Sequence, residues 1–455
     1  MANVMTLDPL DRQMFASSSS GDGRIASLDQ FRGYTVLGMI IVNCIGGYAA
    51  VHAVFKHNDN YFSYADSIMP SFHFAVGCSY RLMFLRRSAT AGLLATRLRF
   101  VRRALALIAI AVLFFGAGGG FRDWQQFHEL PATYSVSSVD GSETTAAQPA
   151  PRFRTTFFAQ WRVYLAHLLK SRMWNTFAII GATQLVILPL IGARPVVRLA
   201  ALVAFAVGHL LLTAWFNWGF VLGDPHNWMA VLWKTGSAGS WDGGFFGPLC
   251  WAVAMLGGTL AYDALASHAS PARAGRTVLA WGCGAMLLAY AFSCLTTFYD
   301  VGAGAQPDPQ LPRYARSPFL PDFSTVGQRP LSSFLAEPPF VAPPGADVRL
   351  GNYWMMCKQI PTLSFILFAT GFAAVLYAMF IFICDGRGVT CGIFRTFGRN
   401  PLAAYVIHDM IGRQLGPLVP ADSPLWYCIL GLLVYTASVY ACVWSLERAN
   451  VFIRV

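Results

Sequence analysis

The sequence predicts an all-α fold, a polytopic transmembrane helical bundle of about ten spans, from its composition and from the spacing of its apolar stretches. Of the 455 residues, 55% are hydrophobic and only 12% are charged, and the mean hydropathy is +0.48. Stretches of roughly 18 to 22 apolar residues, long enough to cross a hydrocarbon core of about 30 Å as helix, recur along the whole chain. This pattern argues against a soluble enzyme and against an enzyme anchored by one helix.

The apolar stretches define the expected spans in chain order. They lie approximately at 33–50, 64–84, 104–120, 173–191, 199–216, 245–263, 277–296, 360–384, 400–412 and 425–446. The second and ninth fit the pattern least well, because Pro70 interrupts the second and the ninth is short and carries His408 and Asp409. No repeat of fixed period is visible, so we treat 33–455 as one domain that follows a lead-in at 1–32.

Basic residues divide unevenly between alternate loops. The loops on the side of both termini hold 18 Lys and Arg in 95 positions, whereas the opposite loops hold 14 over a far greater length. The opposite side includes two long outer excursions, at about 121–172 and 297–359. Since basic residues stay on the cytoplasmic side, we expect both termini in the cytoplasm. The net charge of +11 then has a membrane explanation, and we expect no nucleic-acid partner.

The ten cysteines form no CxxC pair, and most fall inside expected spans, which is typical of buried thiols. Cys294 and Cys357 flank the second outer excursion and are the pair that an oxidising compartment would allow to bond. We find no zinc-type spacing, nucleophilic-serine elbow, phosphate loop or dinucleotide fingerprint, so we predict no metal cofactor.

The candidate catalytic residues are His57, Asp66 and Asn43, which lie around one helical hairpin at the outer membrane edge. Imidazole gains and loses a proton near neutral pH, and a carboxylate can orient it and stabilise its cation. An amide at the end of the first span can donate to a developing oxyanion. Each also has a structural alternative: a hydrated interfacial histidine, a helix N-cap and a helix C-cap. Placing polar groups at a membrane edge costs free energy, which favours the functional interpretation of these three residues.

The candidate cofactor-binding residues lie at the inner edge. Asp29 and Arg32 are one helical turn apart, and a structural ion pair is the simpler interpretation of them. A basic inner loop at 85–103 either anchors the topology at anionic headgroups or clamps the phosphates of a polyanionic cofactor. The arginines from which we predict cofactor binding are Arg97, Arg99, Arg102 and Arg103.

Two further segments contribute candidate substrate-binding residues. Asp242 precedes two glycines that permit a tight turn, so its carboxylate is free to bind a hydroxyl or to cap the sixth span. Asn400, Tyr405 and His408 fall on or near one face of the ninth span. We predict substrate contacts from Asp242, Asn400 and Tyr405 and keep His408 secondary, because a lone histidine inside a helix is more often packed than catalytic.

The run SLDQFRG at 27–33, followed by Asn43, His57 and Asp66, resembles the heparan-alpha-glucosaminide N-acetyltransferase family and its bacterial relatives. The resemblance continues at 241–247 and at 398–405. It implies a polytopic protein that moves an acetyl group from cytoplasmic acetyl-CoA to an amino sugar on the far side. It also implies that His57 is the catalytic histidine.

Together these expectations describe a membrane-embedded, acetyl-CoA-dependent acyltransferase, in a bacterial plasma membrane, that modifies an amino sugar or glycan. His57 would either accept the acetyl group transiently or deprotonate the acceptor. Membrane lipids and, as one option, a second copy of the chain complete the expected partners. The alternative is a transporter or carrier whose intramembrane polar residues line a pathway and perform no acyl transfer.

Overall fold

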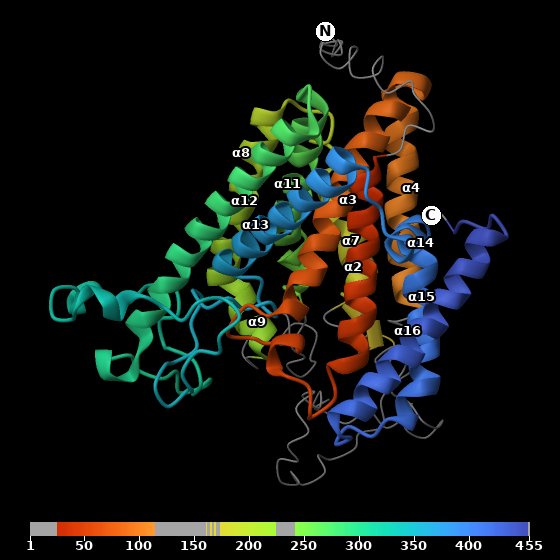
Figure 1. The fold of residues 1–455 in the computed structure, drawn as a ribbon. Coiled ribbons are helices and arrows are strands. Elements are labelled where there is room, and N and C mark those ends of the chain that lie inside the picture. Colours follow the sequence, from red (N-terminus) through yellow and green to blue (C-terminus); the bar gives the residue numbers. More distant parts are fainter. Residues whose placement is uncertain are drawn as a thin grey trace.

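The computed structural model describes residues 25–113, 161, 164–165, 168–169, 173–223 and 242–453. Helices dominate these residues, and their only β pairing consists of isolated bridges in the second outer excursion. The all-α prediction is confirmed. Figure 1 shows the arrangement, a bundle of long helices with α15 and α16 on one side and the outer excursion extending from the other.

The α-helices follow one another in this order, with short 3₁₀ and π segments between or after them: α2 (Ala26–Ile45), α3 (Tyr64–Ala91), α4 (Leu93–Ala111), α7 (Thr176–Ile187), α8 (Pro195–Leu212), α9 (Trp218–Leu222), α11 (Gly247–Ser267), α12 (Pro271–Ser293), α13 (Leu363–Phe380), α14 (Gly392–Arg399), α15 (Pro401–Leu415) and α16 (Leu425–Arg448).

Within the described residues, five helical stretches are long and apolar enough to cross a membrane. They are Pro195–Leu222, Gly244–Ser267, Pro271–Tyr299, Leu363–Asp385 and Leu425–Arg448. All five coincide with expected spans, so the chain is a multi-pass, membrane-embedded helical protein. The remaining helices are shorter or more polar, and the expected span at 104–120 runs beyond the described residues.

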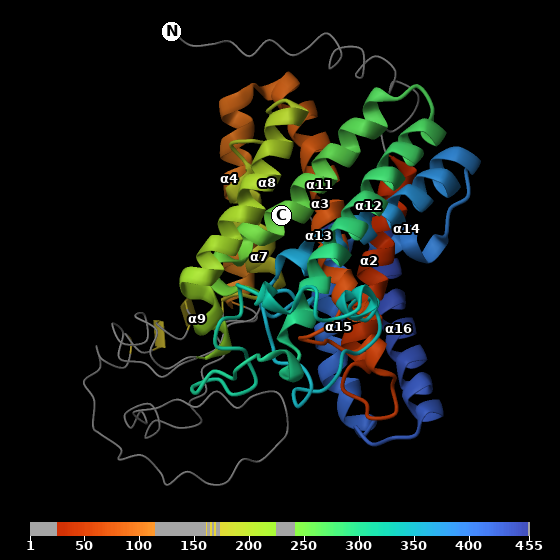
Figure 2. The ribbon, with the colours of Figure 1, turned by 90° about the vertical axis from the view of Figure 1, so that its left-hand side faces the viewer.

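The centre of the bundle is the contact between α3 and α11, where two glycines bring the backbones together. A Cβ on Gly77 would fall on the carbonyl oxygen of Met255, and a Cβ on Gly258 would fall on that of Phe74. Small residues allow this close approach between membrane helices. Figures 1 and 2 show α3 in the middle of the bundle, among the other long helices.

The basic segment at 85–103 is helical, and its prediction as a loop is wrong. Helix α3 runs to Ala91, and α4 begins at Leu93 after Gly92 alone, whose φ of 79° suits glycine. Arginine is a good helix former, so a run of arginines does not end a helix. Pro70 does not interrupt α3 either, because the helix continues through it.

The second outer excursion is irregular and is held by ion pairs. Asp300 binds Arg349 at 2.6 Å and Arg329 at 3.2 Å, and Arg349 also binds Glu337 at 2.6 Å. In Figure 2 the excursion lies beneath α12 and α13. Cys294 and Cys357, the pair that an oxidising compartment would allow to bond, both have free thiols.

Candidate active site

The His57 ring is held against the first turn of α3. Its Nδ1 lies 2.8 Å from Oδ1 of Asp66, and the side chain of His57 is 45% exposed while that of Asp66 is 1% exposed. The Asp66 carboxylate also accepts from the backbone N–H of Asn58 at 3.1 Å and lies 2.6 Å from the Ser63 hydroxyl. Ser63 caps α3 by accepting from the Asp66 N–H. The predicted pair therefore exists, and the cap and the carboxylate position each other.

This arrangement determines which ring nitrogen of the neutral His57 imidazole carries the proton. Because the Asp66 carboxylate acts as an acceptor toward its other partners, Nδ1 of His57 is the donor in their shared hydrogen bond. The lone pair of the neutral ring then lies on Nε2, and the side chain as a whole is 45% exposed. A histidine held in one tautomer by a buried carboxylate is the arrangement that general bases and nucleophile activators use.

Asn43 pairs with another histidine instead. Its Nδ2 lies 3.0 Å from Nε2 of His408 on α15, and Nδ1 of His408 bonds to the carbonyl oxygen of Tyr405. A carbonyl only accepts, so Nδ1 carries the proton and Nε2 accepts from Asn43. One N–H of the Asn43 amide is thereby used, and its second remains for another acceptor. The C-cap alternative for Asn43 does not apply, because Gly46 caps α2.

The segments that carry the two histidine pairs are connected through α2 and α3. Val42, next to Asn43, belongs to the same hydrophobic cluster as Ala65, which precedes Asp66. Ala49 donates its N–H to the carbonyl of Ala421 at 2.7 Å, which ties the loop before His57 to the connection between α15 and α16. The hairpin and the last two helices therefore meet at the outer end.

Lys358 is the member of this site that the sequence did not reveal. Its Nζ lies 3.5 Å from Oδ1 of Asp242, and both side chains are 11% exposed. Burial favours the neutral amine, but the charges of Asp242 and Asp66 outweigh it and raise the pKa of Lys358. A buried ammonium thus stands within electrostatic reach of the carboxylate that holds His57. A lysine just before an apolar span was the available signal.

Asp242 is fixed in the turn before α11. Its φ is 54°, and its carbonyl accepts from the indole N–H of Trp251 at 3.0 Å. The Trp251 ring stacks on His73 of α3, with centroids 4.9 Å apart. Tyr405 of α15 packs on Phe177 of α7 at 4.1 Å between ring centroids, and its carbonyl bonds to the ring of His408. The predicted substrate residue Asp242 therefore lies beside Lys358, and Tyr405 lies beside His408.

Asn400 does not join them. Its side-chain amide donates to the carbonyl of Val451 at 2.9 Å and accepts from the N–H of Ile453 at 3.1 Å. The side chain is fully buried and fixes the C-terminal segment to the start of α15. The predicted substrate contact of Asn400 is therefore replaced by a structural role, because these two bonds occupy both ends of the amide.

The inner candidates lie at the opposite end of the bundle. Arg32 pairs with Asp29 at 3.9 Å and bonds to the Gly398 carbonyl, which supports the structural interpretation of that pair. The charges of Arg99 and Arg32 act on Arg103, so α2 and α4 bring basic groups together. The predicted phosphate ligands, all exposed on α4, are Arg97, Arg99, Arg102 and Arg103.

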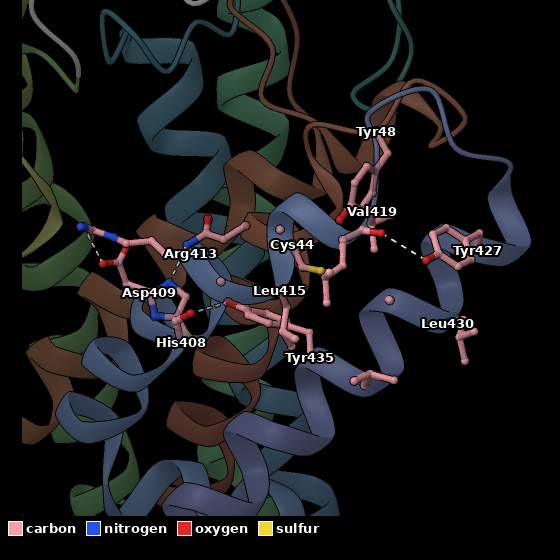
Figure 3. Close-up of a pocket in the computed structure, with 16 residues that line it drawn as sticks. Cys44, Tyr48, His408, Asp409, Arg413, Leu415, Val419, Tyr427, Leu430 and Tyr435 are labelled. Atoms are coloured by element: carbon pink, nitrogen blue, oxygen red, sulfur yellow. Dashed lines mark hydrogen bonds and ion pairs between the residues drawn. The ribbon is translucent and has the colours of Figure 1, made fainter.

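A cavity of about 520 Å³ lies between α2, α15 and α16. Figure 3 shows its residues: the Asp409–Arg413 ion pair (2.8 Å) lies near His408, and the Tyr435 hydroxyl donates to the His408 carbonyl at 3.0 Å. Asn43 lines this cavity as well. No family model and no curated protein matches the sequence.

Proposed function

We propose that this chain is a membrane-embedded acyltransferase that moves an acetyl group from cytoplasmic acetyl-CoA to an amine or hydroxyl on the outer side. The observation that carries the proposal is the half-exposed His57 ring, bonded at 2.8 Å to the buried Asp66. The resemblance of 27–33, Asn43, His57 and Asp66 to the heparan-alpha-glucosaminide N-acetyltransferase family points to the same chemistry.

In the direct route, Nε2 of His57 takes the proton from the acceptor. The acceptor nitrogen or oxygen attacks the thioester carbonyl, a C–N or C–O bond forms, the C–S bond breaks, and the proton passes to the CoA thiolate. In the covalent route, Nε2 first attacks the thioester carbonyl, an N–C bond forms, the C–S bond breaks and the CoA thiolate leaves. The acceptor then attacks the acetyl carbonyl, the N–C bond to His57 breaks, and the proton of the acceptor passes to the CoA thiolate. Asp66 stabilises the imidazolium in the direct route and the acetylated ring in the covalent one.

Two groups suit the negative charge that develops on the carbonyl oxygen. The second N–H of Asn43 is one, since the first is used by His408. The Lys358 ammonium adds positive charge near Asp66 and is shielded from water. A charge held in a dry site acts more strongly than the same charge in water.

The distance between the two ends of α3 sets a requirement for this function. Asp66 and Arg87 are separated by 21 positions on this helix, about 31 Å at 1.5 Å per residue. If arginines at the inner end hold the CoA phosphates, the pantetheine arm must enter the bundle for the thioester to reach His57. Arg forks match phosphate oxygens, so the inner cluster suits that docking.

The test is acetyl-CoA turnover by the purified protein in lipid nanodiscs, followed as free CoA thiol, with amino-sugar, glycan and lipid acceptors supplied. We expect wild type to release CoA and His57→Ala to lose about 10² to 10⁴-fold in rate while it keeps its unfolding temperature. A transporter or carrier would keep its rate of substrate transport in the His57→Ala variant. Absence of acetyl-CoA binding and of CoA release in wild type with every acceptor would overturn the enzyme hypothesis.

A further inference from the structure

The wall that α16 gives to the cavity is continuous with the surface of the protein that faces lipid. Leu430 and Val434 line the cavity and are 48% and 49% exposed. They lie on a candidate membrane span, and only 17% of its apolar window is buried inside the protein. A hydrocarbon chain from the bilayer can therefore enter between α15 and α16 without leaving apolar surroundings.

The opposite end of the cavity is polar but nearly balanced in charge. Asn43 offers the oxygen and the second N–H of its amide, both ring nitrogens of His408 are already used by Asn43 and Tyr405, and the Asp409–Arg413 ion pair neutralises itself at 2.8 Å. Such an end suits a headgroup rich in hydrogen-bonding groups and does not select a strongly charged one. The volume of about 520 Å³ is within the range of roughly 300 to 1,000 Å³ that small-molecule sites occupy.

The outer rim of the cavity leads to the loop that carries His57. Tyr48 lines the cavity, and the next residue, Ala49, donates its N–H to Ala421 at 2.7 Å. His52 then caps the short 3₁₀ helix Ala53–Phe55 with Nδ1, 3.2 Å from the Val54 nitrogen. His57 follows after Lys56, the C-cap of this helix. A headgroup at the polar end thus lies beside the hairpin that presents the catalytic candidate.

From these observations we infer that the cavity binds the acceptor, and that the acceptor is a membrane amphiphile whose headgroup carries an amine or a hydroxyl. This inference rests on the proposed function and names its substrate class. The lipid chain occupies the space between α15 and α16, and the headgroup contacts Asn43 and His408. The acetyl group therefore ends on a lipid rather than on a free sugar.

Gly412 allows the cavity to be filled by one substitution. A Cβ there would meet the Tyr435 ring at an ordinary 3.6 Å, so a larger side chain can start without a clash. A matched control is Gly284 on α12, which is exposed and has no atom within 4 Å of its added Cβ. Gly412→Trp and Gly284→Trp thus make the same change inside and outside the cavity.

The first measurement follows radiolabelled acetyl from acetyl-CoA in membranes that contain each variant, with chloroform extraction of the products. We expect label in the organic phase for wild type and Gly284→Trp, and a loss of about tenfold or more for Gly412→Trp. If His57-dependent label appears only in water-soluble products, the lipid acceptor is wrong while acyl transfer stands. Equal organic label in Gly412→Trp and wild type would also overturn the inference.

A second measurement decides the site even if no acetyl transfer occurs, in which case the proposed function itself fails. The probe is phosphatidylethanolamine with a diazirine in its acyl chain, and the sites of photo-cross-linking are mapped by mass spectrometry. Tyr435 lines the cavity from α16, where the inference places the acyl chain, and it is 4% exposed, so lipids on the outer surface do not label it. Cross-links at Tyr435 that disappear in Gly412→Trp support the site, and cross-links confined to exposed positions contradict it.

Discussion

Asn43 on α2 and His408 on α15 are joined side chain to side chain, with 3.0 Å between Nδ2 and Nε2, although 365 positions separate them in sequence. The contact brings the outer end of the first helix to a helix near the end of the chain. It also gives Asn43 a fixed orientation at the polar end of the cavity, because His408 is itself held by Tyr405.

Removal of the Asn43 amide should therefore lower the rate. We expect Asn43→Ala to reduce kcat by about 10²-fold, the usual cost of losing one oxyanion donor. His408→Gln keeps an acceptor for the amide and should retain more activity than His408→Leu. Initial rates of CoA release measure all three variants. Wild-type rates in Asn43→Ala would refute the role of the amide.

Substitutions of Asp66 and of Ser63 distinguish a catalytic role from a helix-capping role. Asp66→Asn keeps a hydrogen-bonding side chain but loses the carboxylate that holds the Nδ1 proton of His57, so kcat should fall by about 10²-fold or more. Ser63→Ala removes the cap and should cost about 1 kcal/mol of stability with a smaller effect on kcat. Thermal unfolding and turnover of both variants provide the comparison. Equal losses of kcat would show that capping alone accounts for the effect.

Lys358→Met should destabilise the protein in a pH-dependent way. The change leaves the Asp242 carboxylate buried without its cation, which typically costs about 3 to 5 kcal/mol. Because folding raises the pKa of Lys358 above 10.5, its contribution is complete below that pH and is lost as pH rises through the raised pKa. The difference in unfolding temperature between wild type and variant should thus narrow in strongly alkaline buffer.

The double variant Lys358→Met/Asp242→Asn serves as the control for that prediction. The double variant removes the unpaired carboxylate charge of Asp242 and should recover part of the lost stability. A pH-independent difference between wild type and Lys358→Met would contradict the assignment of the loss to this ion pair.

The contact between α3 and α11 predicts strong effects from single methyl groups. Gly77→Ala and Gly258→Ala should each cost at least about 1 to 3 kcal/mol, because the added Cβ falls on a backbone carbonyl that cannot move alone. Gly208→Ala on α8 is the control, since nothing lies within 4 Å of its Cβ. Unfolding temperatures in detergent measure the three variants. Equal unfolding temperatures of Gly77→Ala and Gly208→Ala would mean that α3 and α11 lie further apart than the structure shows.

Arginines on α4 should govern the affinity for acetyl-CoA if they hold its phosphates. The double variant Arg99→Ala/Arg103→Ala should raise KM for acetyl-CoA by about tenfold or more, since a charged hydrogen bond contributes about 1.5 to 3 kcal/mol. Arg273→Ala, an exposed arginine at the start of α12, is the matched control. An unchanged KM in the double variant would contradict phosphate binding and would favour topological anchoring as the role of these arginines.

The sequence predicted those parts of the fold and site that depend on local spacing. The apolar stretches predict all five helical segments that are both long enough and apolar enough to cross a membrane. His57 and Asp66 are nine positions apart across one short loop, so their pairing was accessible. The sequence predicts a loop at Arg99 and Arg103, but both lie in α4, because arginine favours helix.

The parts that escaped prediction depend on distant segments. His408 resembles any packed histidine within its own helix, and only the fold brings Asn43 to it. Lys358 ends an irregular excursion with no periodicity, and its place just before an apolar span does not indicate that it lies beside Asp242. Asn400 looked like a site residue because of its helical face, but the C-terminal backbone uses both ends of its amide.

Helix α3 carries Asp66 near one end and Arg87 near the other on an unbroken rod. The close packing at Gly77 and Gly258 holds the middle of this rod against α11. The first turn of α3, which carries Asp66, and its last turns, which carry Arg87, therefore belong to one rigid element whose position is set by α11.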